Sequence, residues 1–150
     1  MGKLEFYTDG ACSHNGTWKG GYSIVIVEND ELIDSYSDSK EHTTNNEMEL
    51  MAFDWALGLA SSMNHIDSEF IIYSDSAYIV NCFKDEWYIK WQKNGWRTSK
   101  KEPVAHKELW QSILKNYKQL GNRINIVKVK GHSNNKFNNL ADKLAVEASK

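Results

Sequence analysis

The sequence predicts an α/β fold, in which helices flank a five-stranded mixed sheet made of a three-strand antiparallel meander plus two parallel strands. Three observations lead to this prediction. Three strand-length segments with turn residues between them occupy roughly the first 40 positions. Two further strand segments follow later, each separated from the preceding strand by helical spacing of apolar residues. Consecutive strands pair antiparallel, whereas a strand–helix–strand connection favours parallel pairing.

The meander is expected at the N-terminus. Residues 4–8 alternate between two faces and end at Asp9-Gly10, a strand followed by a turn. Residues 22–27 are rich in β-branched side chains, which favour strands. A hairpin turn at 28–31 then leads to residues 32–37, whose more polar composition predicts a position near the sheet edge.

The first long helix is expected to begin at a capping box. Thr44 is followed three residues later by Glu47, and apolar residues recur at helical spacing to about Ser61. Residues 70–73 are continuously apolar, which is typical of a strand buried on both faces. Residues 70–73 are therefore predicted to form a strand in the interior of the sheet.

The second half of the chain is expected to be mostly helical from 77 to 117, with Pro103 in the first turn of a later helix. Residues 124–129 predict the last strand. An apolar stripe from Phe137 to Ala148 predicts a closing helix.

Composition restricts the class of protein. With 41% apolar and 12% aromatic residues, the 150-residue chain can form a core, and its length fits one domain, 1–150. No run of about 18 apolar residues or signal-peptide pattern is present. Cys12 and Cys82 form no CxxC pair, so we expect neither a disulfide framework nor a zinc site. These features predict a cytoplasmic protein.

The net charge of −2 conceals a strong asymmetry. Residues 1–75 carry 3 basic and 14 acidic side chains, a net −11, whereas residues 76–150 carry 15 basic and 6 acidic side chains, a net +9. Such a split indicates nucleic-acid or membrane interaction, although both halves could also be solvated surface.

Four carboxylates are candidates for a shared metal site: Asp9, Glu49, Asp75 and Asp142. Asp9 and Asp75 end predicted strands, where a buried carboxylate is costly unless it is paired or metal-bound. Hard oxygen ligands suit Mg²⁺ or Mn²⁺, and two such ions can clamp both oxygens of a phosphoryl displacement. The alternative is that Asp9 and Asp75 are ordinary turn or cap residues.

Four segments resemble the motifs of type 1 ribonuclease H, in that family's order and spacing and over nearly the whole chain. They are Tyr7-Thr8-Asp9-Gly10, Thr44-Asn45-Asn46-Glu47-Met48-Glu49-Leu50, Tyr73-Ser74-Asp75-Ser76 and Val129-Lys130-Gly131-His132. Asp142 follows ten residues after His132, and the tryptophans of residues 87–110 resemble the family's helical handle. The resemblance implies a ribonuclease H-like fold.

The resemblance also implies an activity. The family cleaves the RNA strand of RNA–DNA hybrids with two Mg²⁺ ions, for which Mn²⁺ can substitute, and leaves 5′-phosphate and 3′-hydroxyl ends. By this resemblance, Asp9 would bridge both ions and Asp142 would share the ion that activates water. Glu49 and Asp75 would hold the ion at the leaving 3′ oxygen. His132 would assist proton movement or product release, a role that suits an imidazole.

Several residues match family positions that contact the hybrid. Recognition of RNA requires groups that meet the 2′-hydroxyl, and the matching positions for the minor groove are Cys12, Asn15, Asn45 and Asn46. Asn15 and Asn45 are also ordinary turn and cap residues. Ala77 stands where well-known bacterial members have a glutamine, so one minor-groove hydrogen bond should be absent.

The family's phosphate pocket is matched by Thr44, together with His42 and His106 where Arg and Asn are frequent. We hypothesise that hybrid binding strengthens as the pH falls through the histidine range, because an imidazolium would bind phosphate. A KM for hybrid that stays flat between about pH 6 and about pH 8.5 would disprove this hypothesis.

The handle region is basic. Residues 84–107 carry 7 basic and 3 acidic side chains among the aromatic residues Trp87, Trp91 and Trp96. Basic groups neutralise phosphates, and aromatic rings can lie against sugars or bases. The alternative is a solvated helix face, with Trp91 and Trp110 as core residues rather than ligand contacts.

Two other functions remain open at this stage: another nuclease of the same broad fold, or a hybrid-binding module without catalysis. The four intact carboxylates favour catalysis. We expect a monomer that acts on RNA–DNA hybrid duplex, without a membrane, an obligate protein partner or a separate hybrid-binding domain.

Overall fold

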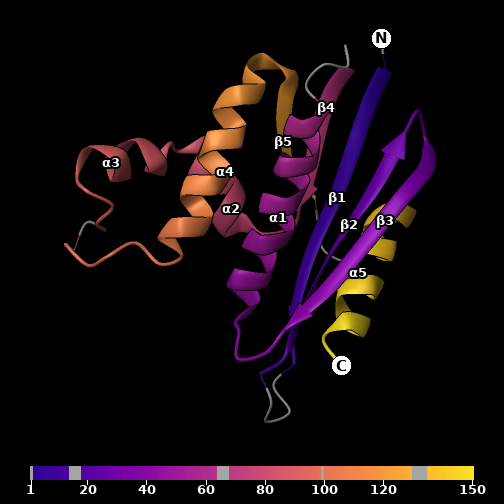
Figure 1. The fold of residues 1–150 in the computed structure, drawn as a ribbon, viewed down its shortest axis with the longest axis horizontal. Helices are drawn as coiled ribbons and strands as arrows, with labels where there is room; N and C mark the ends of the chain where they lie inside the picture. The colour runs from indigo at the N-terminus through magenta and orange to yellow at the C-terminus, as the bar shows by residue number, and fades with distance from the viewer. Residues whose placement is uncertain (1, 14–17, 64–67, 99, 130–134) are drawn as a thin grey trace.

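The computed structural model of the protein describes residues 2–13, 18–63, 68–98, 100–129 and 135–150. Its strands form one sheet in the order β3-β2-β1-β4-β5 (Figure 1). The bounds are β1 Gly2–Cys12, β2 Gly20–Glu28, β3 Glu31–Lys40, β4 Ser68–Ser74 and β5 Ile124–Lys128. The first three strands pair antiparallel, and β4 pairs parallel with both β1 and β5. The predicted mixed sheet is confirmed, including the edge position of β3.

Helices cover both faces of this sheet (Figure 1). Their bounds are α1 Asn45–Ser62, α2 Ala77–Lys84, α3 Trp87–Lys93, α4 Lys107–Leu120 and α5 Lys136–Ala148, with a short 3₁₀ turn at Gly121–Arg123. α1 lies against β1 and β2 with α4 packed on it, and α5 lies against β1 and β2 on the other face. No helix of the described residues is long and apolar enough to cross a membrane.

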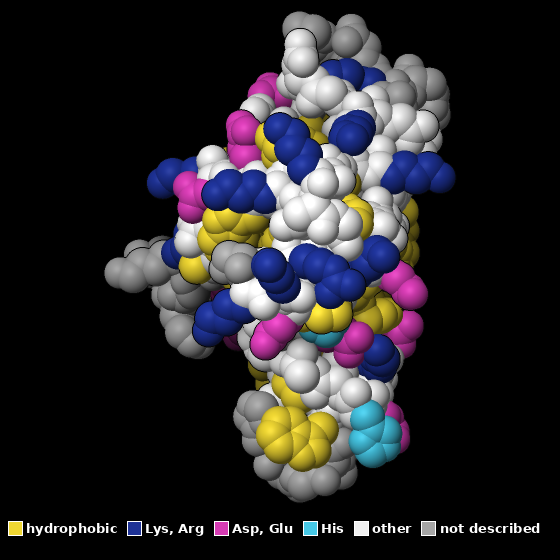
Figure 2. Space-filling view, turned by 90° about the vertical axis from the view of Figure 1, so that its left-hand side faces the viewer, with side chains coloured by type: hydrophobic (Ala, Val, Ile, Leu, Met, Phe, Trp, Pro, Cys, Tyr) yellow, Lys and Arg dark blue, Asp and Glu magenta, His cyan; other side chains and the backbone are white. Residues whose placement is uncertain are grey.

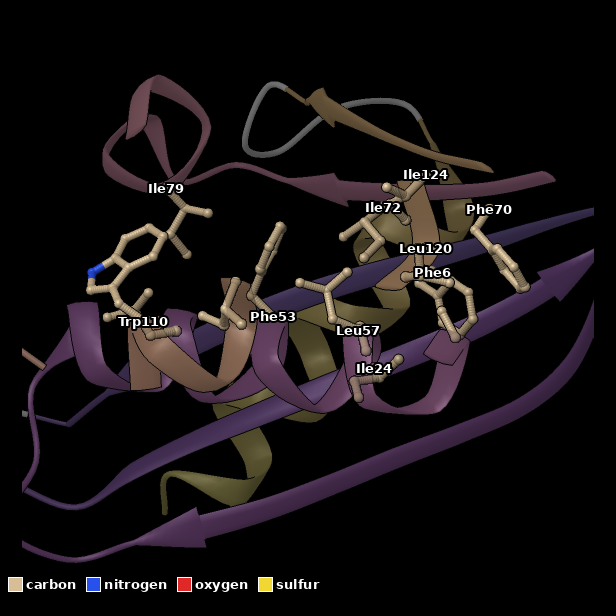
Figure 3. Close-up of a cluster of buried hydrophobic side chains, with 14 of the residues drawn as sticks. Phe6, Ile24, Phe53, Leu57, Phe70, Ile72, Ile79, Trp110, Leu120 and Ile124 are labelled. Atoms are coloured by element: carbon tan, nitrogen blue, oxygen red, sulfur yellow. The ribbon is translucent and has the colours of Figure 1, made fainter. Parts of the chain in front are cut away.

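The larger core lies between the sheet and α1. Phe6 and Ile24 from the sheet meet Phe53 and Leu57 from α1, and the fully buried Trp110 of α4 completes one end (Figure 3). Burial of each such side chain contributes about 1.5–3 kcal/mol. This packing fixes α1 on the sheet, and with it the position of the first turns of α1 beside the end of β1.

The capping box is half confirmed. Thr44 is the N-cap of α1, and its hydroxyl accepts a hydrogen bond from the backbone N–H of Glu47 at 3.2 Å. The Glu47 carboxylate does not make the reciprocal bond within the described residues. It accepts hydrogen bonds from the side chains of Thr43 and Lys40 instead.

Two predictions about segments after the first long helix were wrong. Pro103 does not begin a helix, because the chain there runs extended and forms an isolated bridge with Arg97, and α4 starts only at Lys107. β4 is not buried on both faces: Ile72 is fully buried, whereas Tyr73 is only partly covered. The reason is that α5 packs on β1 and β2 and leaves the outer face of β4 incompletely covered.

Candidate active site

A cavity of about 500 Å³ opens where β1 and β4 end. The two strands are parallel neighbours, so their carboxyl ends share one edge of the sheet, the usual ligand-binding edge of such folds. The side chains of Asp9, Glu49, Asp75 and Asp142 all line this cavity. The four carboxylates that the sequence singled out therefore come together in space.

Three of these carboxylates lie close together. One oxygen from each of Asp9, Glu49 and Asp75 lies within 4.8 Å of the other two. The backbone N–H of Gly10 donates to Oδ1 of Asp9 and to Oε1 of Glu49, both at 2.9 Å. Oε2 of Glu49 is buried and has no hydrogen-bond partner among the described residues. A buried, unpartnered carboxylate oxygen within an all-oxygen cluster fits a hard divalent cation such as Mg²⁺.

The electrostatics of the cluster point the same way. Burial, followed by the nearby charge of Asp75, raises the pKa of Asp9 to about 7. Burial and the charge of Asp9 raise the pKa of Glu49, and burial raises the pKa of Asp75. Carboxylates crowded in this way hold protons unless positive charge compensates them, and a divalent cation supplies such charge.

Gly10 lets the strand and the helix approach each other. A Cβ at this position would lie 2.5 Å from the backbone nitrogen of Glu49 and 2.6 Å from the carbonyl carbon of Met48. Only glycine leaves room for this contact, which brings Glu49 to Asp9. The predicted strand end at Asp9-Gly10 was wrong, because β1 continues to Cys12. The role of Gly10 in this close approach was not predicted, although a glycine directly after a candidate ligand could have indicated it.

Asp142 comes from α5, on the other face of the sheet. It is not one of the three carboxylates within 4.8 Å of one another, but it interacts with Asp9 and helps to raise the pKa of Asp9. A hydrogen bond to α5 comes from Ser23 of β2, which pairs with Asp9 across the strands. The buried hydroxyl of Ser23 donates to the carbonyl of Ala141 at 2.6 Å. One serine thus connects the strands that carry Asp9 with the helix that carries Asp142, and no motif in the sequence indicated this.

Among the residues predicted to meet substrate, Cys12, Asn45 and Asn46 line the cavity, and so does Ala77. Both asparagines are exposed in the first turn of α1, and Cys12 is partly buried. Asn15 and His132 lie outside the described residues. Ser76 and Tyr78 also line the cavity and were not predicted, although their position directly after Asp75 could have indicated them.

The three residues matched to a phosphate pocket are placed differently from one another. Thr44 is exposed and caps α1, whereas His42 is exposed on the preceding loop. His106 is the N-cap residue of α4, and its Nδ1 lies 3.9 Å from Oε2 of Glu47. No described interaction joins His42 to the other two residues. The proposed pH dependence of hybrid binding stays a prediction.

The tryptophans of the handle are partly structural. Trp91 packs edge-on against the buried Trp110 at 5.6 Å between ring centroids, and Trp96 lies 6.1 Å from Trp91. Trp87 and Trp91 also line a second cavity of about 370 Å³ together with Lys90 and Arg97. Figure 2 views this side of the molecule, where Lys and Arg side chains gather. Trp87 and Trp91 therefore each pack against other aromatic rings and also lie near basic groups.

Comparison with known proteins agrees with this geometry. The sequence model of the RNase H family matches residues 1–150. The chain belongs to the ribonuclease H family. Ribonuclease H of Acetivibrio thermocellus is 45% identical over 152 residues, which cover 100% of this chain and 97% of the relative. The resemblance inferred from the motifs is confirmed.

Solved ribonuclease H structures share the fold. LC9-RNase H1, a type 1 RNase H with the type 2 active-site motif, is 25% identical with a TM-score of 0.81, over 99% of this chain and 72% of that chain. A foamy viral protease-reverse transcriptase in complex with RNA/DNA hybrid is 26% identical with a TM-score of 0.81, over 99% of this chain and 20% of that chain. The acidic cavity therefore lies in a domain with the ribonuclease H fold.

Proposed function

We propose that this ribonuclease H is a Mg²⁺-dependent endonuclease that hydrolyses the RNA strand of RNA–DNA hybrids and leaves 5′-phosphate and 3′-hydroxyl ends. The observation that carries the proposal is the open cavity lined by Asp9, Glu49, Asp75 and Asp142 in a chain that the family model matches from end to end. The viral relative bound to RNA/DNA hybrid supports this choice of substrate.

The four carboxylates would hold two Mg²⁺ ions, or Mn²⁺ in their place. When bound, the ions would supply the positive charge that activates water and stabilises the leaving oxygen. The protein's own contribution is positional. The Gly10 N–H fixes the carboxylates of Asp9 and Glu49, since it donates to both. Orientation of this kind keeps the reacting groups in line.

Substrate selection falls to groups at the cavity rim. The amides of Asn45 and Asn46 can both donate and accept hydrogen bonds, as a 2′-hydroxyl requires. Ala77, at the same rim, can do neither with its side chain. The basic side chains of residues 84–107 would contact the backbone of the duplex. Four properties stay predictions: a role for His132, a cytoplasmic location, a monomeric state and action as one domain.

One experiment distinguishes the three functions considered. RNA–DNA hybrid, duplex DNA, duplex RNA and single-stranded RNA are offered with Mg²⁺ and with EDTA. We expect cleavage of the RNA in the hybrid alone, abolished by EDTA and lowered more than about 100-fold in Asp9→Asn. Asp34→Asn, the same change on the exposed strand β3, is the control and should retain activity.

The other outcomes are equally informative. Cleavage of duplex DNA would indicate another nuclease activity on the same fold. Tight hybrid binding without cleavage would indicate a binding module, and either result would contradict the proposal.

A further inference from the structure

Glu47, in the first turn of α1, is surrounded by groups that bind anions. Its Oε2 accepts a hydrogen bond from Nζ of Lys40 at 2.8 Å, and its Oε1 accepts one from the hydroxyl of Thr43. Nδ1 of His106 lies 3.9 Å from Oε2. These groups come from the end of β3, from the loop before α1 and from the N-cap of α4. The side chain of Glu47 is only 18% exposed, so its carboxylate is held among them.

Glu47 forms an ion pair with Lys40, and the hydroxyl of Thr43 donates a hydrogen bond to the second oxygen of the same carboxylate. A structural role as a helix cap does not account for the arrangement. Within the described residues, the backbone N–H groups of the first turn do not donate to this carboxylate, and the cap is supplied by Thr44.

Glu47 is a neighbour of both groups of residues that a substrate would contact. Glu47 follows Asn46, which lines the active-site cavity, and the next turn carries Glu49. On its other side is His106, where the basic segment 84–107 ends. Glu47 therefore adjoins one residue of the cavity and one end of the basic segment. An ammonium, a hydroxyl and an imidazole are the donors that a phosphodiester would use.

We propose that Glu47 is an internal counter-ion that occupies an anion-binding set formed by Lys40, Thr43 and His106, and thereby weakens binding of the substrate backbone at this edge of the site. The inference rests on the proposed function, because it names a residue that sets the affinity for that substrate. It makes Glu47 an affinity-lowering residue in a surface that otherwise favours nucleic acid. Removal of its charge should free the ammonium of Lys40 for phosphate.

The test is Glu47→Gln, which keeps an acceptor oxygen for Thr43 but removes the charge. Binding of RNA–DNA hybrid is measured in EDTA, and KM and kcat are measured with Mg²⁺, at 50 and 200 mM salt. We expect tighter binding and a lower KM. Each additional phosphate contact steepens the fall of the binding constant with salt concentration by a power of about 0.9. The increase in hybrid affinity over wild type should therefore be about 3.5-fold larger at the lower salt concentration than at the higher one.

Two further variants make the test specific. Glu41→Gln removes the same charge from an exposed residue that makes no described ion pair, so it should give a smaller gain and little change in salt dependence. Lys40→Gln added to Glu47→Gln should remove the gain, because the freed ammonium is lost. Thermal unfolding checks that each variant is folded.

The outcomes separate this inference from the proposed function. If the wild-type protein neither binds nor cleaves hybrid, the proposed function is wrong. If it does both, and Glu47→Gln binds no more tightly than Glu41→Gln, the counter-ion role is wrong. Retention of the gain in the double variant would also overturn it.

Discussion

The close approach of β1 and α1 at Gly10 makes a sharp prediction for Gly10→Ala. The added Cβ would lie 2.5 Å from the backbone nitrogen of Glu49 and 2.6 Å from the carbonyl carbon of Met48. Both are backbone atoms in the first turns of a packed helix, so they cannot move aside as a flexible side chain would. The strand and the helix must therefore separate by several tenths of an ångström or more.

The expected magnitude follows from this contact. Overpacking of a well-packed interior costs about 1–3 kcal/mol in the free energy of unfolding. For a domain of this size, a loss of about 2 kcal/mol lowers Tm by about 4–8 °C. The same displacement moves Glu49 relative to Asp9, and a misplacement of about 1 Å can cost about 100-fold in rate. We expect a large loss of kcat in a protein that still folds with a moderately lower Tm.

Thermal unfolding and hybrid cleavage under saturating Mg²⁺ measure the two effects. The matched control is Gly58→Ala in the middle of α1, where the nearest heavy atom to an added Cβ is 4.0 Å away. That variant should gain about 0.5–1 kcal/mol from helix propensity and keep its activity. A Gly10→Ala protein with unchanged Tm and kcat would refute the steric argument.

Three other predictions test the surroundings of the site. Asp9→Asn should stabilise the protein in EDTA at about pH 8 by about 1–3 kcal/mol, because burial and neighbouring charge disfavour the ionised form and raise the pKa of Asp9 to about 7; an unchanged Tm would contradict this. Ser23→Ala removes the hydrogen bond to α5, which carries Asp142, so it should lower the free energy of unfolding by about 1 kcal/mol and kcat about tenfold, and raise the Mg²⁺ concentration needed for activity. An unchanged Mg²⁺ dependence would show that Ser23 does not position Asp142. Burial raises the pKa of Cys82 to about 12, so a thiol reagent at about pH 8 should label one cysteine in the native chain and two after denaturation, as counted by mass spectrometry.

Much of the fold could be predicted because its signals are local. Strand alternation, the Thr44 N-cap and the apolar stripe of the closing helix each depend on neighbours within a few residues. The errors occurred where distant packing decides. Pro103 lies in an extended segment because it faces Arg97, and the outer face of β4 is only partly covered because α5 lies elsewhere.

The sequence by itself determined a mixed α/β fold with an antiparallel meander and two parallel strands, the family, and the choice of four candidate carboxylates, because these depend on residue types in a fixed order along the chain. Only the tertiary structure decided that three of them meet within 4.8 Å, that Gly10 permits this approach, and that Glu47 faces His106. The physical reason is that these contacts join segments far apart in the sequence. Their geometry follows from the packing of helices on the sheet, which no local pattern encodes.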